Sequence, residues 1–139
     1  MGYSPLFAKD LPLVAGELGV IEVRQEARLL ARELGFDPGD QTRIAAAVSE
    51  VARLCGPGRA SFHFVTDESR AGLECTLTPD EERVREGPAP RQAPSPQQVL
   101  SGVQRLVDDL EVRPSANGAT MVTLRKWRRV TPLDTQGYA

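Results

Sequence analysis

The sequence predicts an α+β fold, a two-layer sandwich in which helices cover one face of an antiparallel or mixed sheet. Two observations lead to this prediction. Apolar residues recur at helical spacing in three stretches, and they alternate with polar residues in two neighbouring stretches and again near the C-terminus. The order along the chain is a short strand, two helices, two strands, a proline-rich segment, a helix and a closing strand. With 139 residues, the chain is expected to form a single domain, 1–139.

The composition excludes several classes of protein. Charged residues make up 26% of the chain and its formal net charge is −2, so no basic excess indicates a nucleic-acid partner. No apolar run is long enough to span a membrane, and residues 1–20 lack the pattern of a targeting segment. The two cysteines, Cys55 and Cys75, do not form a CxxC motif, which favours a reduced interior. We therefore expect a cytoplasmic protein that binds neither nucleic acid nor membrane.

The clearest element is a helix over residues 37–55. Asp37 is expected to cap it, Pro38 suits the first helical position, and Asp40 completes a turn resembling a capping box. The Gly-Pro-Gly triplet at 56–58 ends it. Four apolar residues at spacings of four, three and four predict its buried face: Ile44, Val48, Val51 and Cys55.

The elements around this helix follow from the same patterns. A short first strand is expected near Leu11–Glu17, where Pro12 requires an edge position or the strand's start, followed by a helix over about 20–34. Alternating residues over 60–66 and 71–78 predict an antiparallel hairpin with one face on the helices.

The last third of the chain begins with a change of composition. Residues 80–97 are charged at their start, hold four prolines between Pro88 and Pro96, and show no apolar periodicity, so we expect a flexible loop with extended polyproline character. A third helix is expected over about 97–111, and the β-branched, alternating stretch 121–127 predicts the closing strand.

Two stretches carry a resemblance to a known family. DQTRIAAAVSEVAR in the 37–55 helix and the TLRKW ending are similar to the bacterial anti-sigma-factor serine kinases of the RsbT/RsbW type. These kinases belong to the GHKL superfamily of histidine-kinase-like ATPases. The resemblance covers roughly 20–78 and 98–127 and implies the same two-layer sandwich. It also implies four sequence boxes that bind Mg-ATP.

The first two boxes depart from the family pattern. Glu50 stands at the position of the family's Glu, but Leu54 replaces the Asn that holds Mg²⁺, and an aliphatic side chain offers no oxygen to a hard cation. The resemblance then implies Asp-x-Gly-x-Gly after strand 71–78, where the Asp would bind adenine. Depending on the alignment, Pro79 or Asp80 takes that place, and neither glycine of the motif is kept.

The other two boxes are also changed. The proline-rich segment stands in place of a glycine-rich lid, and prolines remove the backbone donors that phosphate binding needs. Gly102 is similar to the glycine at the start of the family's last helix. The closing Gly-Thr pair corresponds to Ala119 and Thr120, or to Gly118 if the alignment slips by one residue.

These departures favour a pseudokinase over an active enzyme. The first hypothesis is a protein-binding regulatory module of partner-switching or sigma-factor signalling, with no metal site and no cofactor. The alternative is a divergent ATP-dependent protein serine kinase, with Glu50 as base, Asp80 displaced towards adenine, and Gly118 and Thr120 as remnants of nucleotide binding. A third hypothesis is an unrelated structural domain.

The partners that the resemblance implies are proteins of four kinds. They are a STAS-domain anti-anti-sigma factor, a sigma factor, a SpoIIE-type phosphatase and another kinase-like subunit, in a homo- or hetero-oligomer. If the nucleotide is lost, Leu54 is expected to collapse against the third helix or the lid segment, because burying a leucine is favourable by about 1.5–3 kcal/mol.

Other candidate chemistry has a structural interpretation. His63 has no partner at metal-ligand spacing, and Ser49 has no histidine base nearby in the sequence. The basic residues around Trp127 are expected to lie at a solvated strand edge, although basic and aromatic residues together also occur in nucleic-acid sites.

Overall fold

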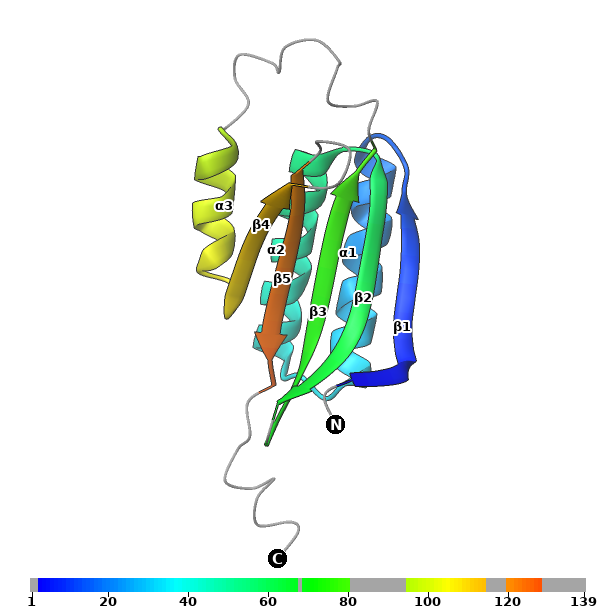
Figure 1. Ribbon diagram of the computed structural model, residues 1–139, viewed down its shortest axis with the longest axis vertical. Coiled ribbons are helices and arrows are strands. Elements are labelled where there is room, and N and C mark those ends of the chain that lie inside the picture. The colour runs from blue at the N-terminus through cyan, green and yellow to red at the C-terminus, as the bar shows by residue number, and fades with distance from the viewer. Residues whose placement is uncertain (1–2, 68, 81–94, 115–119, 129–139) are drawn as a thin grey trace, which may run out of the picture.

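The computed structural model describes residues 3–67, 69–80, 95–114 and 120–128 (Figure 1). The helices and strands follow one another along the chain in the order β-α-α-β-β-α-β-β. The elements are β1 (Tyr3–Leu13), α1 (Glu17–Glu33), α2 (Pro38–Cys55), β2 (Gly58–Asp67), β3 (Arg70–Pro79), α3 (Pro96–Gln104), β4 (Asp109–Pro114) and β5 (Thr120–Trp127).

The five strands form one sheet in the order β1-β2-β3-β5-β4, and each neighbouring pair is antiparallel. Figure 1 shows α1 and α2 side by side behind this sheet, while α3 lies beside β4 and packs against α2. The front face carries no helix of the described chain. The predicted α+β sandwich with helices on one face is therefore confirmed.

The core lies between the two long helices and the inner face of the sheet. Phe62 of β2, Cys75 of β3 and Leu124 of β5 are neighbours across the sheet, and all three are buried. The helices complete this layer with residues at helical spacing: Val23, Ala27, Leu30 and Ala31 from α1, and Ile44, Val48, Val51 and Cys55 from α2. The predicted buried face of the 37–55 helix is confirmed.

The ends of α2 also agree with the sequence. The carboxylate of Asp37 accepts a hydrogen bond from the backbone N–H of Asp40 at 2.7 Å, so one of the four N–H groups left free by helix geometry is satisfied. At the other end, Gly56 has a φ of 70° and stops the helix. The side chain of Asp40 is buried, with other partners described below.

Two boundaries were predicted wrongly. The first strand runs from Tyr3 to Leu13 and not to Glu17, because Glu17 already begins α1. Pro12 lies in an edge strand, paired with Arg59, as expected.

The other wrong boundary is that of the third helix. It ends at Gln104, and residues 109–114 form the edge strand β4, which the sequence analysis missed. The run of Leu106, Val107 and Leu110 fits a helical period, but its short length leaves helix and strand equally compatible with the pattern.

The proline-rich segment is only partly described. Residues 81–94, on which the prediction of a flexible loop falls, lie outside the described residues. At its end, Ser95 caps α3 through a complete capping box with Gln98, and Pro96 takes the first helical position. None of the helices that the structure describes is long and apolar enough to cross a membrane.

Candidate functional site

Four elements that are far apart in the sequence meet at a hollow of about 300 Å³. It lies where α2 and β3 end and where α3 and β5 begin, so the antiparallel order of β3 and β5 brings their end and start together. The described residues that line it are Leu54, Cys55, Pro79, Pro96, Leu100, Thr120 and Val122. All four predicted boxes therefore contribute a residue to one place: Leu54, Pro79, Pro96 from the proline-rich segment, and Thr120.

The part of the lining that the structure describes is uncharged. None of the described side chains that form it is ionised at neutral pH, and its polar groups are the hydroxyl of Thr120 and the thiol of Cys55. Burial raises the pKa of the Cys55 thiol to about 11, so this group is neutral and a weak nucleophile. The described side chains of the lining are thus mainly apolar, and the hydroxyl of Thr120 is exposed among them.

Leu54 does not close the hollow. Its side chain is half-buried and faces the same space as Leu100 of α3. The expected collapse of Leu54 against the third helix is therefore not what the described residues show, and the other expected contact, with the lid segment, falls on residues 81–94, outside the described residues.

The charged residues of the predicted boxes lie outside this lining. Glu50 is exposed one turn before Leu54, and its carboxylate contacts Arg53 at 3.5 Å. Asp80 is exposed after β3, and its backbone N–H donates to the carbonyl of Pro57 at 2.9 Å. Gly118 lies outside the described residues. The roles predicted for Glu50, Asp80, Gly118 and Thr120 stay predictions.

Gly102, the glycine singled out near the start of the last helix, is exposed on α3. A Cβ atom built at this position would meet no described atom within 4 Å. Local packing therefore does not require glycine here. Ser49, also considered above, is buried, and its hydroxyl donates to the carbonyl of Ala46 at 2.9 Å.

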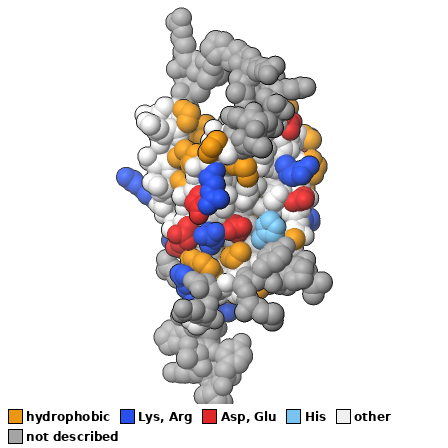
Figure 2. All heavy atoms as spheres, in the orientation of Figure 1, with side chains coloured by type: hydrophobic (Ala, Val, Ile, Leu, Met, Phe, Trp, Pro, Cys, Tyr) orange, Lys and Arg blue, Asp and Glu red, His pale blue; other side chains and the backbone are white. Residues whose placement is uncertain are grey.

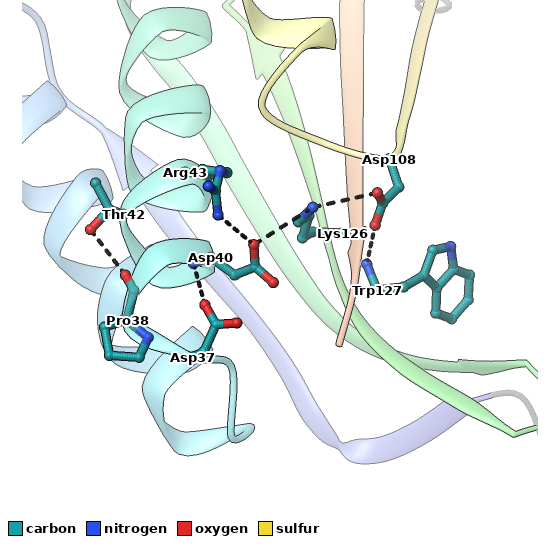
Figure 3. Close-up of polar contacts among 8 residues, drawn as sticks. All are labelled: Asp37, Pro38, Asp40, Thr42, Arg43, Asp108, Lys126 and Trp127. Atoms are coloured by element: carbon teal, nitrogen blue, oxygen red, sulfur yellow. Dashed lines mark hydrogen bonds and ion pairs between the residues drawn. The ribbon is translucent and has the colours of Figure 1, made fainter. Parts of the chain in front are cut away.

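A partly buried ionic cluster lies at the opposite end of α2 (Figure 3). Asp40 is 1% exposed, and its carboxylate contacts the guanidinium of Arg43 at 3.0 Å and the ammonium of Lys126 at 3.8 Å. Lys126 is 6% exposed and also contacts Asp108 at 3.4 Å. Asp108 in turn accepts a hydrogen bond from the backbone N–H of Trp127 at 2.7 Å. This cluster ties the start of α2 to β5 and to the turn before β4.

The cluster corrects one prediction and shows a missed signal. Lys126 is a buried residue of a central strand, and the basic end of the chain is not simply a solvated strand edge. Val122, Leu124 and Lys126 share one face of β5 because side chains alternate along a strand. The alternation already placed Lys126 among core residues, and a buried lysine requires an acidic partner.

The front face of the sheet has a different character. Figure 2 looks onto this face, where acidic and basic side chains cross the middle beside the single histidine. The register places His63, Glu74, Arg125 and Asp109 in one row across four strands. A hydrogen bond from Arg125 to Glu74 raises the pKa of the guanidinium above its ordinary value, so Arg125 stays charged at any physiological pH.

The fold agrees with the class of protein that the sequence predicts. An antiparallel sheet backed by two long helices, with a hollow at the end of the second helix, is consistent with a GHKL-like sandwich. No protein-family model matches the chain.

Comparison with known proteins gives the family. The serine/threonine-protein kinase RsbT of Bacillus subtilis (strain 168) is 32% identical over 123 residues, with 81% of this chain and 92% of the relative covered. The chain therefore belongs to the family of RsbT-type serine/threonine-protein kinases, which confirms the resemblance. A chain of the crystal structure of the SiaB-SiaC complex from Pseudomonas aeruginosa matches with a TM-score of 0.43 and 12% identity, over 86% of this chain and 89% of its own length.

Proposed function

We propose that this chain is a pseudokinase: a protein-binding regulatory module of bacterial partner-switching or sigma-factor signalling that works without ATP. The observation that carries the proposal is the uncharged lining that the described residues give the hollow. Leu54 stands there at the position where the family resemblance implies an Asn, and Pro79 stands at or next to the position of the implied Asp, depending on whether Pro79 or Asp80 is aligned with it. A Mg-nucleotide needs oxygen ligands for the metal and donors for its phosphates, and these side chains offer neither.

Partners follow from family membership. They are of the kinds that the family resemblance implies, with a STAS-domain anti-anti-sigma factor or a SpoIIE-type phosphatase as the first to test, and the protein would act in the cytoplasm. Pull-down of the native protein from its own cells, read by mass spectrometry, tests this part of the proposal. Recovery of no regulatory protein of these kinds would contradict it.

The absence of ATP binding is tested by thermal unfolding. A ligand that binds only the folded state must raise the melting temperature. We expect millimolar Mg-ATP to leave the Tm of this chain unmoved, with RsbT measured in parallel as the kinase control. A rise of several degrees would contradict the pseudokinase proposal.

Two observations favour a second candidate function. The relative is named as a kinase, and Glu50 is exposed to solvent on the α2 flank that carries Leu54. The chain would then be a divergent protein serine kinase with Glu50 as general base. Transfer of labelled phosphate from ATP to a STAS-domain protein, abolished by Glu50→Gln but not by Arg43→Gln, would establish this alternative.

A further inference from the structure

We propose that the hollow between α2, α3 and β5 binds a small, uncharged and mainly apolar molecule about the size of two fused rings. This proposal shares with the proposed function the condition that ATP does not occupy the hollow. It adds a ligand class that family membership does not supply.

The size and lining of the hollow lead to this ligand class. A cavity of about 150 Å³ lined by aliphatic side chains is known to accept benzene. The present hollow has about twice that volume, and its described walls are Leu54, Pro79, Pro96, Leu100 and Val122. Ligand pockets in proteins are mostly apolar, with a few polar groups that fix orientation. The hydroxyl of Thr120 and the thiol of Cys55 are such groups here.

The lining also selects against charge. A charged ligand in the hollow would lose solvation without finding an ionised partner among the described lining residues. Glu50 and Asp80 lie near the lining along the chain, and both are exposed to solvent, so neither would pair with a charged ligand in the hollow. An uncharged molecule therefore fits best.

Of the elements around the hollow, α3 is expected to respond most to a bound ligand. This helix has nine residues, and Val103 is its only fully buried one. Besides Val103, the half-buried Val99 and Leu100 attach this helix to the core, and Leu100 lines the hollow together with Leu54. A ligand packed between these two leucines would add apolar contacts to α3, so its amide protons should exchange more slowly when the hollow is filled.

The test compares three compounds on the full chain. 2-Naphthol has two fused rings and one hydroxyl, 2-naphthalenesulfonate has the same rings with a charge, and Mg-ATP is the family ligand. We expect 2-naphthol to bind saturably, to raise the Tm and to slow exchange in α3, and the sulfonate to bind at least tenfold more weakly. Absence of 2-naphthol binding up to its solubility limit, or equal binding of the sulfonate, overturns the proposal.

Substitutions test whether the ligand binds in the hollow. Leu54→Asp puts a charge into the lining and should weaken 2-naphthol binding more than tenfold, whereas Leu29→Asp on the exposed face of α1 should leave it unchanged. Thr120→Val should weaken 2-naphthol but not naphthalene, and because Thr120 is exposed this variant should fold normally. Equal binding to Leu54→Asp and wild type, with the fold of both confirmed by circular dichroism, overturns the proposal. A Tm raised by Mg-ATP refutes the proposed function instead.

Discussion

The two ends of α2 differ in chemistry although they belong to one helix. At its start, Asp40 is buried among cations, and at its end Leu54 lines a hollow whose described side chains are uncharged. Asp40, Ala47 and Leu54 are seven residues apart and therefore follow one flank of the helix, with a drift of about 20° per heptad. The chemistry along this flank is set by what faces it: Lys126 of β5 at one end and Leu100 of α3 at the other.

The comparison of the two ends of α2 shows at which end charged side chains stabilise the fold. The family resemblance directs attention to polar groups at the end of α2, where the described lining is apolar. The buried charges lie instead at its start, where they join three elements. Each end can be tested separately.

The largest effect is expected from breaking the ionic cluster. Asp40→Ala should lower the free energy of unfolding by about 3 kcal/mol, because it removes one of the two acidic partners that the described residues give the buried Lys126, the other being Asp108. Urea unfolding measures this loss. The matched control is Glu50→Ala, which removes an exposed pair and should cost less than about 1 kcal/mol. Equal losses would show that the cluster is no more important than a surface pair.

The next effect concerns pH at the other end of the helix. The pKa of Cys55 is raised to about 11 by burial, whereas in the unfolded chain a thiol loses its proton near pH 8.5. The neutral thiol is therefore favoured in the folded state, and its stabilising contribution is full below about pH 8 and is lost as pH rises towards 11. The free energy of unfolding should fall by about 1.4 kcal/mol per pH unit in the middle of this range.

The variant Cys55→Ala isolates this contribution. Its unfolding free energy, measured by urea titration between pH 8 and 11, should fall less steeply with pH than that of the wild type. Equal slopes for the variant and the wild type would mean that Cys55 ionises equally in the folded and unfolded states. The C-terminal end of α2 would then be more accessible to water than the structure indicates.

A smaller effect is expected at Leu54. Leu54→Asn restores the residue type of the family but replaces a half-buried apolar side chain, so it should lower stability by about 1.5 kcal/mol, roughly half of a full burial. Leu29→Asn, at a leucine that is 47% exposed, is the control and should cost less than about 0.5 kcal/mol. Mg-ATP should not raise the Tm of either variant. A stable Leu54→Asn variant that binds ATP would reverse our view of this end of the helix.

The smallest effect is expected from the cap that precedes the ionic cluster. Asp37→Ala removes the acceptor for the N–H of Asp40 and should cost about 1 kcal/mol by thermal or urea unfolding. Asp37→Asn keeps an acceptor oxygen and should recover most of the loss. If the two variants are equally unstable, the charge of Asp37, and not its hydrogen bond, stabilises this end.

Much of the fold could be predicted from the sequence because local signals agreed with the tertiary structure. The cap at Asp37, the stop at Gly56 and the alternation in β2 and β3 each act within a few residues. The edge strand β4 could not be separated from a helix, since its six residues, one turn after α3, are too few to define a period.

The site was less predictable, for a physical reason. The resemblance identified Leu54, Pro79 and Thr120 separately, but only the antiparallel pairing of β3 with β5 places them around one hollow. Asp108 and Lys126 are 18 residues apart, and their contact depends on a turn before β4 that the sequence analysis did not contain. Long-range pairing, and not residue type, decided both sites.

The prolines on the two edge strands have a consequence for aggregation. Pro12 lies in β1 and Pro114 ends β4, and a proline has no N–H to offer to an added strand. An exposed strand edge is the usual template on which chains stack into fibrils, and proline and charged residues on an edge oppose such growth. At high concentration, copies of this chain should therefore resist joining their sheets into a continuous one.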